Sequence, residues 1–349
     1  MKTYLNSQGI VVPDNRLKSF SVSAANQHPP KRIQRLRELI KSKSPHICIL
    51  RGEGIGDVLM TTPIIDALVD SFNKEVEITY ATNTQYLDGA LVKTLKYNPN
   101  VHHIIDRDNL DEAEYDIVIN LHCPAIAHEK PMAPPINRID LFANHAGIKL
   151  DKKLPRFFLQ EEEIYQGSSY LNQISYSDTK RIMINLISSA PSRSLLTNHL
   201  YYALSELGNL GYQLLIVQHY TDHASIKQYN SLPGAIAIVD KDIRELASVM
   251  VNCHLLICPD SALLHLAGAL SFPVIGLFGP TDPRARINYY PTAKAIWGGK
   301  DLPGHPHWYE KCPCNNLCWN NITKDLIVNT SLGILNTSKI NHNIITELI

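Results

Sequence analysis

The sequence predicts an α/β protein made of two Rossmann-like domains that face a central cleft. Three observations lead to this prediction. The chain has 349 residues, which is long for one hydrophobic core and typical of two. Apolar, strand-like runs alternate with segments of helical spacing in both halves of the chain. A charged and polar stretch from 160 to 179 separates the halves. Such alternation predicts parallel sheets that bind ligands at the carboxyl ends of their strands.

The first domain is expected to span residues 46–170. Its strand-like runs are HICILR, EVEITYAT, VHHIID and YDIVINL, at residues 46–51, 75–82, 101–106 and 115–121. Between the first two runs, residues 58–72 carry an apolar side chain at every third or fourth position, which predicts a helix. The other gaps are long enough for crossover helices, so the strands should pair in parallel.

The second domain, residues 171–335, is expected to repeat this alternation. Strand-like runs lie at residues 181–188, 212–218, 235–240, 254–260 and 273–280, with segments of helical spacing between them. The final residues, 336–349, include INHNIITELI, whose apolar spacing predicts a C-terminal helix that packs against one of the two domains.

Residues 1–45 form an N-terminal extension with one recognisable element. From Lys31 to Lys43 the chain is basic, and apolar residues recur at helical spacing. Its basic face could contact a membrane surface or an acidic partner, or it could be the solvated face of a packed helix.

The composition excludes several classes of protein. Lys and Arg together number 33, as do Asp and Glu, so the formal net charge is zero and no nucleic-acid partner is expected. The chain shows neither the apolar core of a signal peptide nor a run of roughly 20 apolar residues that could span a membrane, so a cytoplasmic protein is expected. Seven cysteines, several in apolar runs, argue against a disulfide framework.

A glycine-rich loop follows the first strand-like run of the first domain. Gly52, Gly54 and Gly56 would let the backbone turn sharply and let a ligand approach it closely. Asp57 comes next, at the start of the predicted helix, where it could cap the helix or act on a ligand. The alternating glycines differ from the dinucleotide fingerprint, and no Lys-Ser or Lys-Thr pair completes a P-loop. The negative charge of Asp57 would repel a pyrophosphate, so this position suits a ligand with an uncharged hydroxyl group instead.

Two sequence blocks resemble the heptosyltransferase family of bacterial inner-core lipopolysaccharide synthesis. RGEGIGDVLMTTPIIDAL, beginning at Arg51, resembles its glycine-Asp loop and first helix, and residues 255–283 resemble its donor-site signature. The resemblance extends from about residue 46 to the end. It implies a GT-B fold and an inverting transfer, without a catalytic metal, of a heptose from a nucleotide diphosphate, typically ADP. It also implies that Asp57 is the catalytic base, with residues 46–170 on the acceptor side and 171–335 binding the donor.

The same resemblance implies a set of donor-binding residues. Ser188, Ser189 and Arg193 follow a strand and would contact the diphosphate, unless Arg193 is an ordinary surface residue. Asp260 would accept a hydrogen bond from a sugar hydroxyl, or it could cap a helix. His265 could be a donor-site residue, or a buried histidine whose hydrogen bonds are made within the protein. The full donor set at this stage is Ser188, Ser189, Arg193, Asp222, Asp260, Ser261, Ala262, His265, Gly279 and Thr281.

The acceptor-binding residues implied are fewer. They are Gly56, Asn120, His122 and Arg138. Arg138 belongs to a stretch, RIDLFA, that resembles the acceptor domain of the family, and it could bind an acidic acceptor or bridge two helices. The acceptor is expected to be a saccharide like the lipopolysaccharide core, or a protein hydroxyl group.

A cysteine cluster lies near the end of the second domain. Cys312, Cys314 and Cys318 follow His305 and His307 closely. Three thiolates and one imidazole, that of His307, would form a structural zinc or iron site, and reduced surface thiols are the alternative. Relatives that modify autotransporter proteins carry a cysteine-bound metal in this region, which favours a protein acceptor.

Two other functions fit the same fold and remain open at this point. One is a non-catalytic protein that binds nucleotide sugars or serves as a scaffold, and the other is a nucleotide-sugar epimerase, which needs no acceptor.

Overall fold

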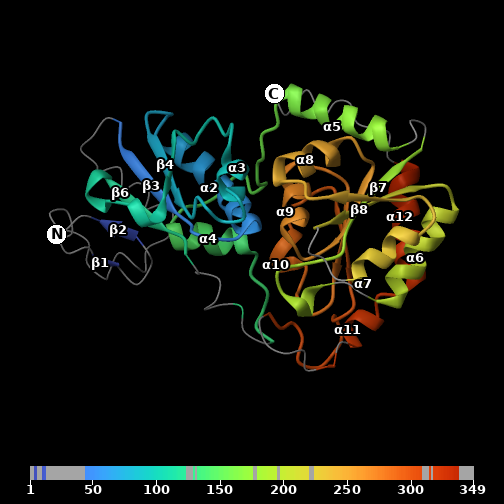
Figure 1. Cartoon of the computed structure of the whole chain (residues 1–349). Coiled ribbons are helices and arrows are strands. Elements are labelled where there is room, and N and C mark those ends of the chain that lie inside the picture. Colours follow the sequence, from blue (N-terminus) through green and yellow to red (C-terminus); the bar gives the residue numbers. More distant parts are fainter. Residues whose placement is uncertain are drawn as a thin grey trace. The chain divides into compact units, whose positions relative to one another are not determined.

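The chain consists of two compact units in the computed structural model (Figure 1). Unit 1 comprises Met1–His128 and Ile136–Phe157, and unit 2 comprises Glu129–Pro135 and Phe158–Ile349. The structure describes residues 4–5, 10–12, 44–122, 129, 132–175, 179–194, 197–219, 224–308, 314–315 and 317–337. The predicted basic helix from Lys31 to Lys43 and most of the predicted C-terminal helix lie outside these residues.

Unit 1 contains a mixed sheet whose described strands run in the order β1-β2-β6-β3-β4-β5. These are β1 (Tyr4–Leu5), β2 (Ile10–Val12), β3 (His46–Leu50), β4 (Glu77–Thr82), β5 (His103–Asp106) and β6 (Ile117–Asn120). Strands β6, β3, β4 and β5 pair in parallel, and β2 pairs antiparallel with β6 and with β1. The helical elements are α2 (Ile55–Ser71), α3 (Ala90–Leu95), α4 (Arg138–Ala146), η3 (Arg107–Asn109) and η4 (Glu112–Glu114).

Unit 2 contains a parallel sheet in the order β12-β11-β10-β7-β8-β9. Its strands are β7 (Arg181–Asn185), β8 (Gln213–Gln218), β9 (Ala235–Val239), β10 (Leu255–Pro259), β11 (Val274–Phe278) and β12 (Ala293–Trp297). Its longer helices are α5 (Glu161–Ile174), α6 (Asn198–Asn209), α8 (Ile243–Val251), α9 (Ala262–Ala269) and α12 (Lys324–Thr337). Shorter ones are η5 (Pro191–Arg193), α7 (Ala224–Lys227), η6 (Gln228–Ser231), α10 (Arg284–Ile287) and α11 (Leu317–Asn320).

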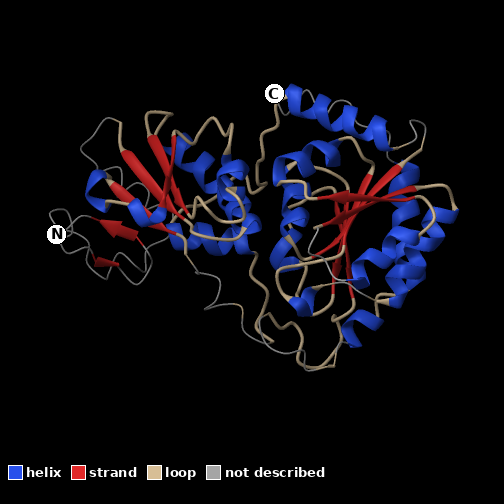
Figure 2. Cartoon of the chain, in the orientation of Figure 1, coloured by secondary structure: helices blue, strands red, loops and turns tan. Residues whose placement is uncertain are grey.

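Helices cover both faces of the unit 2 sheet. Figure 1 shows α6 and α12 on one side of the strands and α8 and α9 on the other. The core on the first side joins side chains of α6 and α12, such as Leu204 and Ile327, to strand residues such as Ile257 and Leu277. Burial on both faces explains why these strands read as continuous apolar runs in the sequence (Figure 2).

Both sheets contain a point at which the strand order reverses. In unit 1 the reversal lies between β3 and β6, and in unit 2 it lies between β7 and β10. At such a point the loops after the two strands diverge to opposite faces and leave a crevice in which ligands bind. The segments that follow these four strands are therefore the first places to look for a site.

The strand predicted at residues 273–280 is followed by one that the periodicity does not reveal. Strand β12 is the edge of the unit 2 sheet, and Ala293, Lys294 and Ala295 are partly or fully exposed. An edge strand with one covered face lacks the long apolar run of its neighbours. Strands β1 and β2 in the N-terminal extension were likewise not predicted.

Helix α5 belongs to unit 2, although the sequence analysis places residues 46–170 in the first domain. Arg244 of α8 forms an ion pair of 2.5 Å with Glu163 of α5. A Cβ atom at Gly167 would lie 2.3 Å from the carbonyl oxygen of Ser248, so α5 lies directly against the α8 backbone. Packing partners distant in sequence thus move the division to residues 157 and 158. Among the residues described, no helix is both long and apolar enough to cross a membrane.

Candidate active site

Asp57 lies directly after β3, in the first turn of α2, and two arginines hold its carboxylate. Its Oδ2 atom accepts a hydrogen bond from Arg51, and its Oδ1 atom lies 2.7 Å from Nη1 of Arg138. The side chains of Arg51, Asp57 and Arg138 are 8%, 15% and 11% exposed. The two guanidinium groups stabilise the charged carboxylate and orient both of its oxygen atoms.

Asp57 does not occupy the N-cap position of α2, because the N-cap residue is Gly54 and Asp57 lies in the first turn. Gly54 has a φ of 84°, which favours glycine, and a Cβ atom there would lie 3.2 Å from Oδ2 of Asp57. At Gly52 a Cβ atom would lie 2.4 Å from Nη1 of Arg107, so a larger residue there would displace the end of that arginine side chain. Gly56 belongs to the helix, not to the loop as expected, because α2 begins at Ile55.

Side chains after the neighbouring parallel strands reach the same edge of the sheet. Asn120 is the last residue of β6 and pairs with Leu50 of β3. Its Oδ1 atom accepts a hydrogen bond of 2.9 Å from the backbone of His122. Arg107 follows β5, and its Nη1 atom lies 3.3 Å from Oε1 of Glu53 in the glycine loop. The structure thus brings the predicted Asn120 and His122 to the edge that carries the glycine loop.

The charges of this cluster change the protonation of its neighbours. The pKa of His122 is lowered from its ordinary value of 6.5, first by desolvation and then by the positive charges of Arg51 and Arg107. The pKa of Tyr86 is raised, first by burial and then by nearby carboxylates. Both groups are therefore uncharged at neutral pH, and they are suited to bind hydroxyl groups through hydrogen bonds.

The sequence analysis does not identify Arg51 and Arg107. A signal for Arg51 exists, because an arginine directly after an apolar strand is placed where its charge needs a buried partner. Arg107 carries no such signal. Its role depends on Gly52, which is distant in sequence and lies against its side chain.

In unit 2, the loops after β7 and β10 are joined by hydrogen bonds. Ser188 Oγ donates to the backbone oxygen of Asp260 at 2.7 Å. Arg193 Nη1 lies 3.1 Å from Oδ2 of Asp260, and its Nη2 atom lies 3.2 Å from Oγ of Ser189. Asn185, the last residue of β7, donates to Oγ of Ser261 at 3.0 Å. The predicted residues of both loops therefore meet at the point where the strand order reverses.

A second arginine, missed by the sequence analysis, completes a buried charge cluster around Asp260. Nε of Arg286 lies 3.2 Å from Oδ2 of Asp260, and its Nη1 atom lies 2.7 Å from Oε1 of Glu129. The side chains of Arg286, Asp260 and Glu129 are 2%, 3% and 3% exposed. Together with Arg193 the cluster has two positive and two negative charges, so each buried charge has an opposite one nearby.

His265 is buried in helix α9. Its Nδ1 atom lies 2.8 Å from the hydroxyl of Tyr290, and its Nε2 atom lies 3.8 Å from Oδ1 of Asp260. His265 therefore resembles a buried histidine with hydrogen-bond partners in the core, which lies beside Asp260 and helps to position it. Ser261 is the residue before α9, and Ala262 begins it, so the backbone N–H groups of this end lie beside the cluster.

The turn after β11 is largely buried. Trp319 lies against Gly279, since a Cβ atom there would be 2.4 Å from the indole ring. Thr281 is 1% exposed, and its Oγ1 atom has no hydrogen-bond partner among the described residues. After β8, His219 lies 3.5 Å from Asp240, whereas the predicted Asp222 lies outside the described residues.

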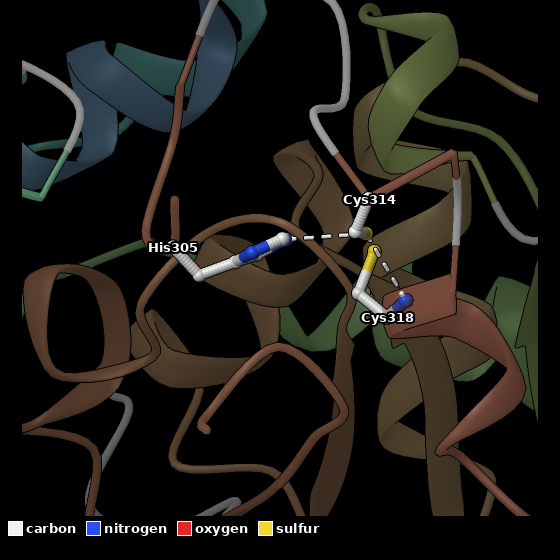
Figure 3. A group of neighbouring side chains, drawn as sticks. All are labelled: His305, Cys314 and Cys318. Atoms are coloured by element: carbon white, nitrogen blue, oxygen red, sulfur yellow. Dashed lines mark hydrogen bonds between the residues drawn. The ribbon is translucent and has the colours of Figure 1, made fainter. Parts of the chain in front are cut away.

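The cysteine cluster is assembled around His305 (Figure 3). Nε2 of His305 lies 3.6 Å from Sγ of Cys314, and the candidate ligand atoms of His305, Cys314 and Cys318 lie within 4.8 Å of one another. The structure thus places His305 beside the two thiols, whereas the sequence prediction named His307, which is buried and whose backbone N–H donates to Pro280. Cys312 lies outside the described residues.

One distance in this cluster equals that expected for two ligands of a tetrahedral metal site. For ligand bonds typical of zinc, a sulfur and a nitrogen on one ion are about 3.6 Å apart. The 3.6 Å between Cys314 and His305 matches that value. The five described cysteines, Cys48, Cys253, Cys258, Cys314 and Cys318, are free thiols. Burial raises the pKa of the Cys48 and Cys253 thiols to about 12, so these two thiols stay protonated at neutral pH.

A family of known proteins matches the part of the chain that contains the loops of unit 2 described above. The model of glycosyltransferase family 9 (heptosyltransferase) matches residues 127–317, which is more than half of the chain. This range contains the Asp260 cluster and most of the cysteine cluster. No curated protein sequence matches the chain.

Several solved structures share the fold. A glycosyl transferase of family 9 from Veillonella parvula is 18% identical with a TM-score of 0.66, and the match covers 84% of this chain and 98% of that one. The E. coli ADP-heptose lipopolysaccharide heptosyltransferase II is 16% identical with a TM-score of 0.57, covering 83% and 98%. The iron-containing dodecameric glycosyltransferase TibC from enterotoxigenic E. coli is 13% identical with a TM-score of 0.57, covering 84% and 79%.

These likenesses show the fold, which is α/β with parallel sheets and of the GT-B type that the resemblance implied. The family match, which is independent of them, covers the loops that meet at the reversal of the unit 2 sheet. The chain therefore belongs to glycosyltransferase family 9, the heptosyltransferase family, and is a glycosyltransferase.

Proposed function

We propose that this chain transfers a heptose from ADP-heptose to a hydroxyl group of a saccharide or protein, with inversion at the anomeric carbon and Asp57 as the base. The observation that carries the proposal is the carboxylate of Asp57, held by Arg51 and Arg138 at the reversal point of the unit 1 sheet. Family membership supplies the reaction class, and this geometry supplies the acid–base group.

The first part of the proposed reaction is the activation of the acceptor. The acceptor oxygen attacks the anomeric carbon, and its proton passes to an oxygen of the Asp57 carboxylate as the new C–O bond forms. The pair of arginines keeps the carboxylate ionised and correctly oriented before attack. His122 and Tyr86, both uncharged at neutral pH, are placed in our proposal to bind other hydroxyl groups of the acceptor.

The second part is departure of the nucleoside diphosphate. The bond between the anomeric carbon and the phosphate oxygen breaks, and the leaving group takes the electron pair and gains negative charge. Arg193, the hydroxyl of Ser189 and the N–H groups at the start of α9 are the groups we assign to that charge. Arg193 now contacts Asp260, and Arg286 would keep Asp260 paired when Arg193 turns to the diphosphate.

The proposed donor is inferred from solved relatives, and the proposed acceptor is inferred from the charged residues near Asp57. The solved relatives include an E. coli heptosyltransferase described as an ADP-heptose enzyme, which favours ADP-heptose as donor here. For the acceptor, Arg107 and Arg138 are two cationic groups near Asp57 that suit a saccharide with an anionic substituent. The cysteine cluster, which the sequence resemblance links to relatives that modify proteins, favours a protein hydroxyl group as the alternative acceptor.

We further propose that His305, Cys314 and Cys318 hold a structural zinc or iron ion, with Cys312 as the fourth ligand. A relative with this fold, TibC, is described as iron-containing. When bound, the ion would join two segments of unit 2 and take no part in the transfer. Metal analysis of the purified protein should find about one ion per chain. Cys314→Ser should lose it, whereas Cys253→Ser, a thiol buried elsewhere, should retain it.

Release of nucleoside diphosphate tests the main proposal. The protein is mixed with ADP-heptose, or with UDP- and GDP-sugars, with and without lipopolysaccharide core saccharides or an acceptor protein. We expect ADP release that depends on an acceptor. A change in the sugar without any acceptor would indicate an epimerase, and tight binding without turnover would indicate a binding protein.

Asp57→Asn tests the assignment of the base. Because a positioned base contributes roughly 10²- to 10⁴-fold to a rate, kcat should fall by that order while donor affinity is kept. Asp66→Asn is the matched control, since Asp66 lies on the same helix and contacts Asn100 and Arg156. If Asp57→Asn turns over as fast as Asp66→Asn, another group is the base.

A further inference from the structure

Trp319 contacts two segments of the proposed donor site at once. Its indole Nε1–H donates a hydrogen bond of 3.0 Å to the backbone oxygen of Ser192, in the short helix η5 that also carries Arg193. Its ring lies against Gly279, where a Cβ atom would be 2.4 Å away. Trp319 is 6% exposed, so these contacts are shielded from water.

The support behind Trp319 comes from the cysteine cluster. Trp319 directly follows Cys318, whose backbone N–H lies 3.4 Å from Sγ of Cys314. Gly298 lies tightly against this segment, because a Cβ atom there would be 1.8 Å from the carbonyl oxygen of Cys318. Asn321 donates a hydrogen bond of 2.8 Å to the backbone of Gly298. The segment of α11 is thus held by contacts other than the one between Trp319 and Ser192.

The turn that carries Arg193 is short. η5 spans Pro191–Arg193, and its internal backbone hydrogen bonds run from Arg193 to Ala190 and from Ser194 to Pro191. The hydroxyl of Ser194 adds a hydrogen bond of 3.2 Å to the backbone oxygen of Ser188. A 3₁₀ turn of one turn's length has few hydrogen bonds of its own, so the contact of Trp319 with Ser192 helps to set its geometry.

We infer that Trp319 is a positioning residue for the donor. It holds η5 through Ser192 so that the guanidinium of Arg193 points at the diphosphate, and it links the cysteine cluster to donor affinity. This inference rests on the proposed function, because it assigns Arg193 to the diphosphate. A residue that only fills the core would need the indole ring but not its N–H group.

The test separates the N–H group from the ring. Trp319→Phe keeps an aromatic ring and removes the hydrogen bond to Ser192. Trp297→Phe is the matched control, because the indole N–H of Trp297 is buried and has no hydrogen-bond partner among the described residues. Binding of ADP, UDP, GDP and CDP to each protein is measured by calorimetry. One lost hydrogen bond corresponds to about a 3- to 10-fold weaker affinity, which we expect for Trp319→Phe alone.

A double-mutant cycle with Arg193→Ala supplies the second readout. Arg193→Ala should weaken binding of the nucleotide about tenfold or more, and adding Trp319→Phe to it should change affinity little further. A purely structural effect of Trp319→Phe would persist in the Arg193→Ala protein, and that result would overturn the inference.

The remaining outcomes are also distinguishable. Equal nucleotide affinity of Trp319→Phe and Trp297→Phe would overturn the inference and leave the proposed function standing. Failure of the unmodified protein to bind any of the four nucleotides would overturn the proposed function, and the inference with it.

Discussion

Replacement of Arg286 by Met should destabilise unit 2 severely. Arg286 lies between the carboxylates of Asp260 and Glu129, at 3.2 Å and 2.7 Å, and is 2% exposed. Its guanidinium also lies 4.6 Å from the ring of Trp308. Met retains much of the volume but leaves two buried carboxylates without the charge between them. Removing one partner from a buried ion pair costs about 3–5 kcal/mol.

The natural probe for this experiment is tryptophan fluorescence during unfolding in urea. The chain has three tryptophans, at positions 297, 308 and 319, and all lie in unit 2, so the signal reports that unit. With a dependence of about 2.5 kcal/mol per molar urea, the unfolding midpoint should fall by roughly 1–2 M.

A matched control lies on α12, in the same unit. Lys324 pairs with Glu206 at 2.5 Å, and the two side chains are 39% and 41% exposed, so Lys324→Met should change the midpoint little. Adding Glu129→Gln to Arg286→Met should recover part of the loss, because it removes one of the two buried carboxylate charges between which Arg286 lies. Equal midpoints for Arg286→Met and Lys324→Met would show that the buried cluster is not a source of stability.

Three further predictions follow from individual contacts. Gly54→Ala should lower activity strongly, because its Cβ atom would lie 3.2 Å from the carboxylate of Asp57, the base in our proposal. Gly211→Ala has a similar φ of 90° but open space around the new Cβ atom, so it should cost only about 1 kcal/mol of stability. Equal activity in the two variants would contradict this reasoning. His254 accepts a hydrogen bond of 3.1 Å from the Arg181 backbone, and its pKa is lowered, first by burial and then by nearby positive charges. In the unfolded chain His254 has its ordinary pKa of 6.5, so below that pH the unfolded chain binds more protons than the folded one. The contribution of neutral His254 to the free energy of unfolding is therefore complete above pH 6.5 and is lost as the pH falls below it. The urea midpoints of the unmodified protein and of His254→Gln should converge toward low pH. Thr281→Val should keep or slightly raise the urea midpoint of unfolding, because the hydroxyl group that it removes is buried and has no hydrogen-bond partner among the described residues. If that hydroxyl group binds the donor, the same substitution should weaken ADP binding, which calorimetry measures.

The periodicity of the sequence was sufficient for the main parallel strands of both units and for the loops that follow them. Apolar runs report burial of a strand directly, since a strand covered on both faces must be apolar along its length. The edge strand β12 was not predicted, because one of its faces is exposed and its residues do not form an apolar run. Helix α5 was placed in the wrong unit because its partners, Arg244 and Ser248, follow it by some 80 residues.

The sequence by itself therefore determined the fold class and the glycine loop, both of which follow from local pattern. Its resemblance to the heptosyltransferase family predicted Asp57 and the loop residues Ser188, Ser189, Arg193 and Asp260 as site residues. Only the tertiary structure decided the partners: Arg138 lies 81 residues from Asp57, and Glu129 lies 157 residues from Arg286. It also brings the candidate ligand atom of His305 within 4.8 Å of the thiols of Cys314 and Cys318. An ion pair or a metal site depends on distances of a few ångströms between segments remote in sequence, and no local periodicity encodes those distances.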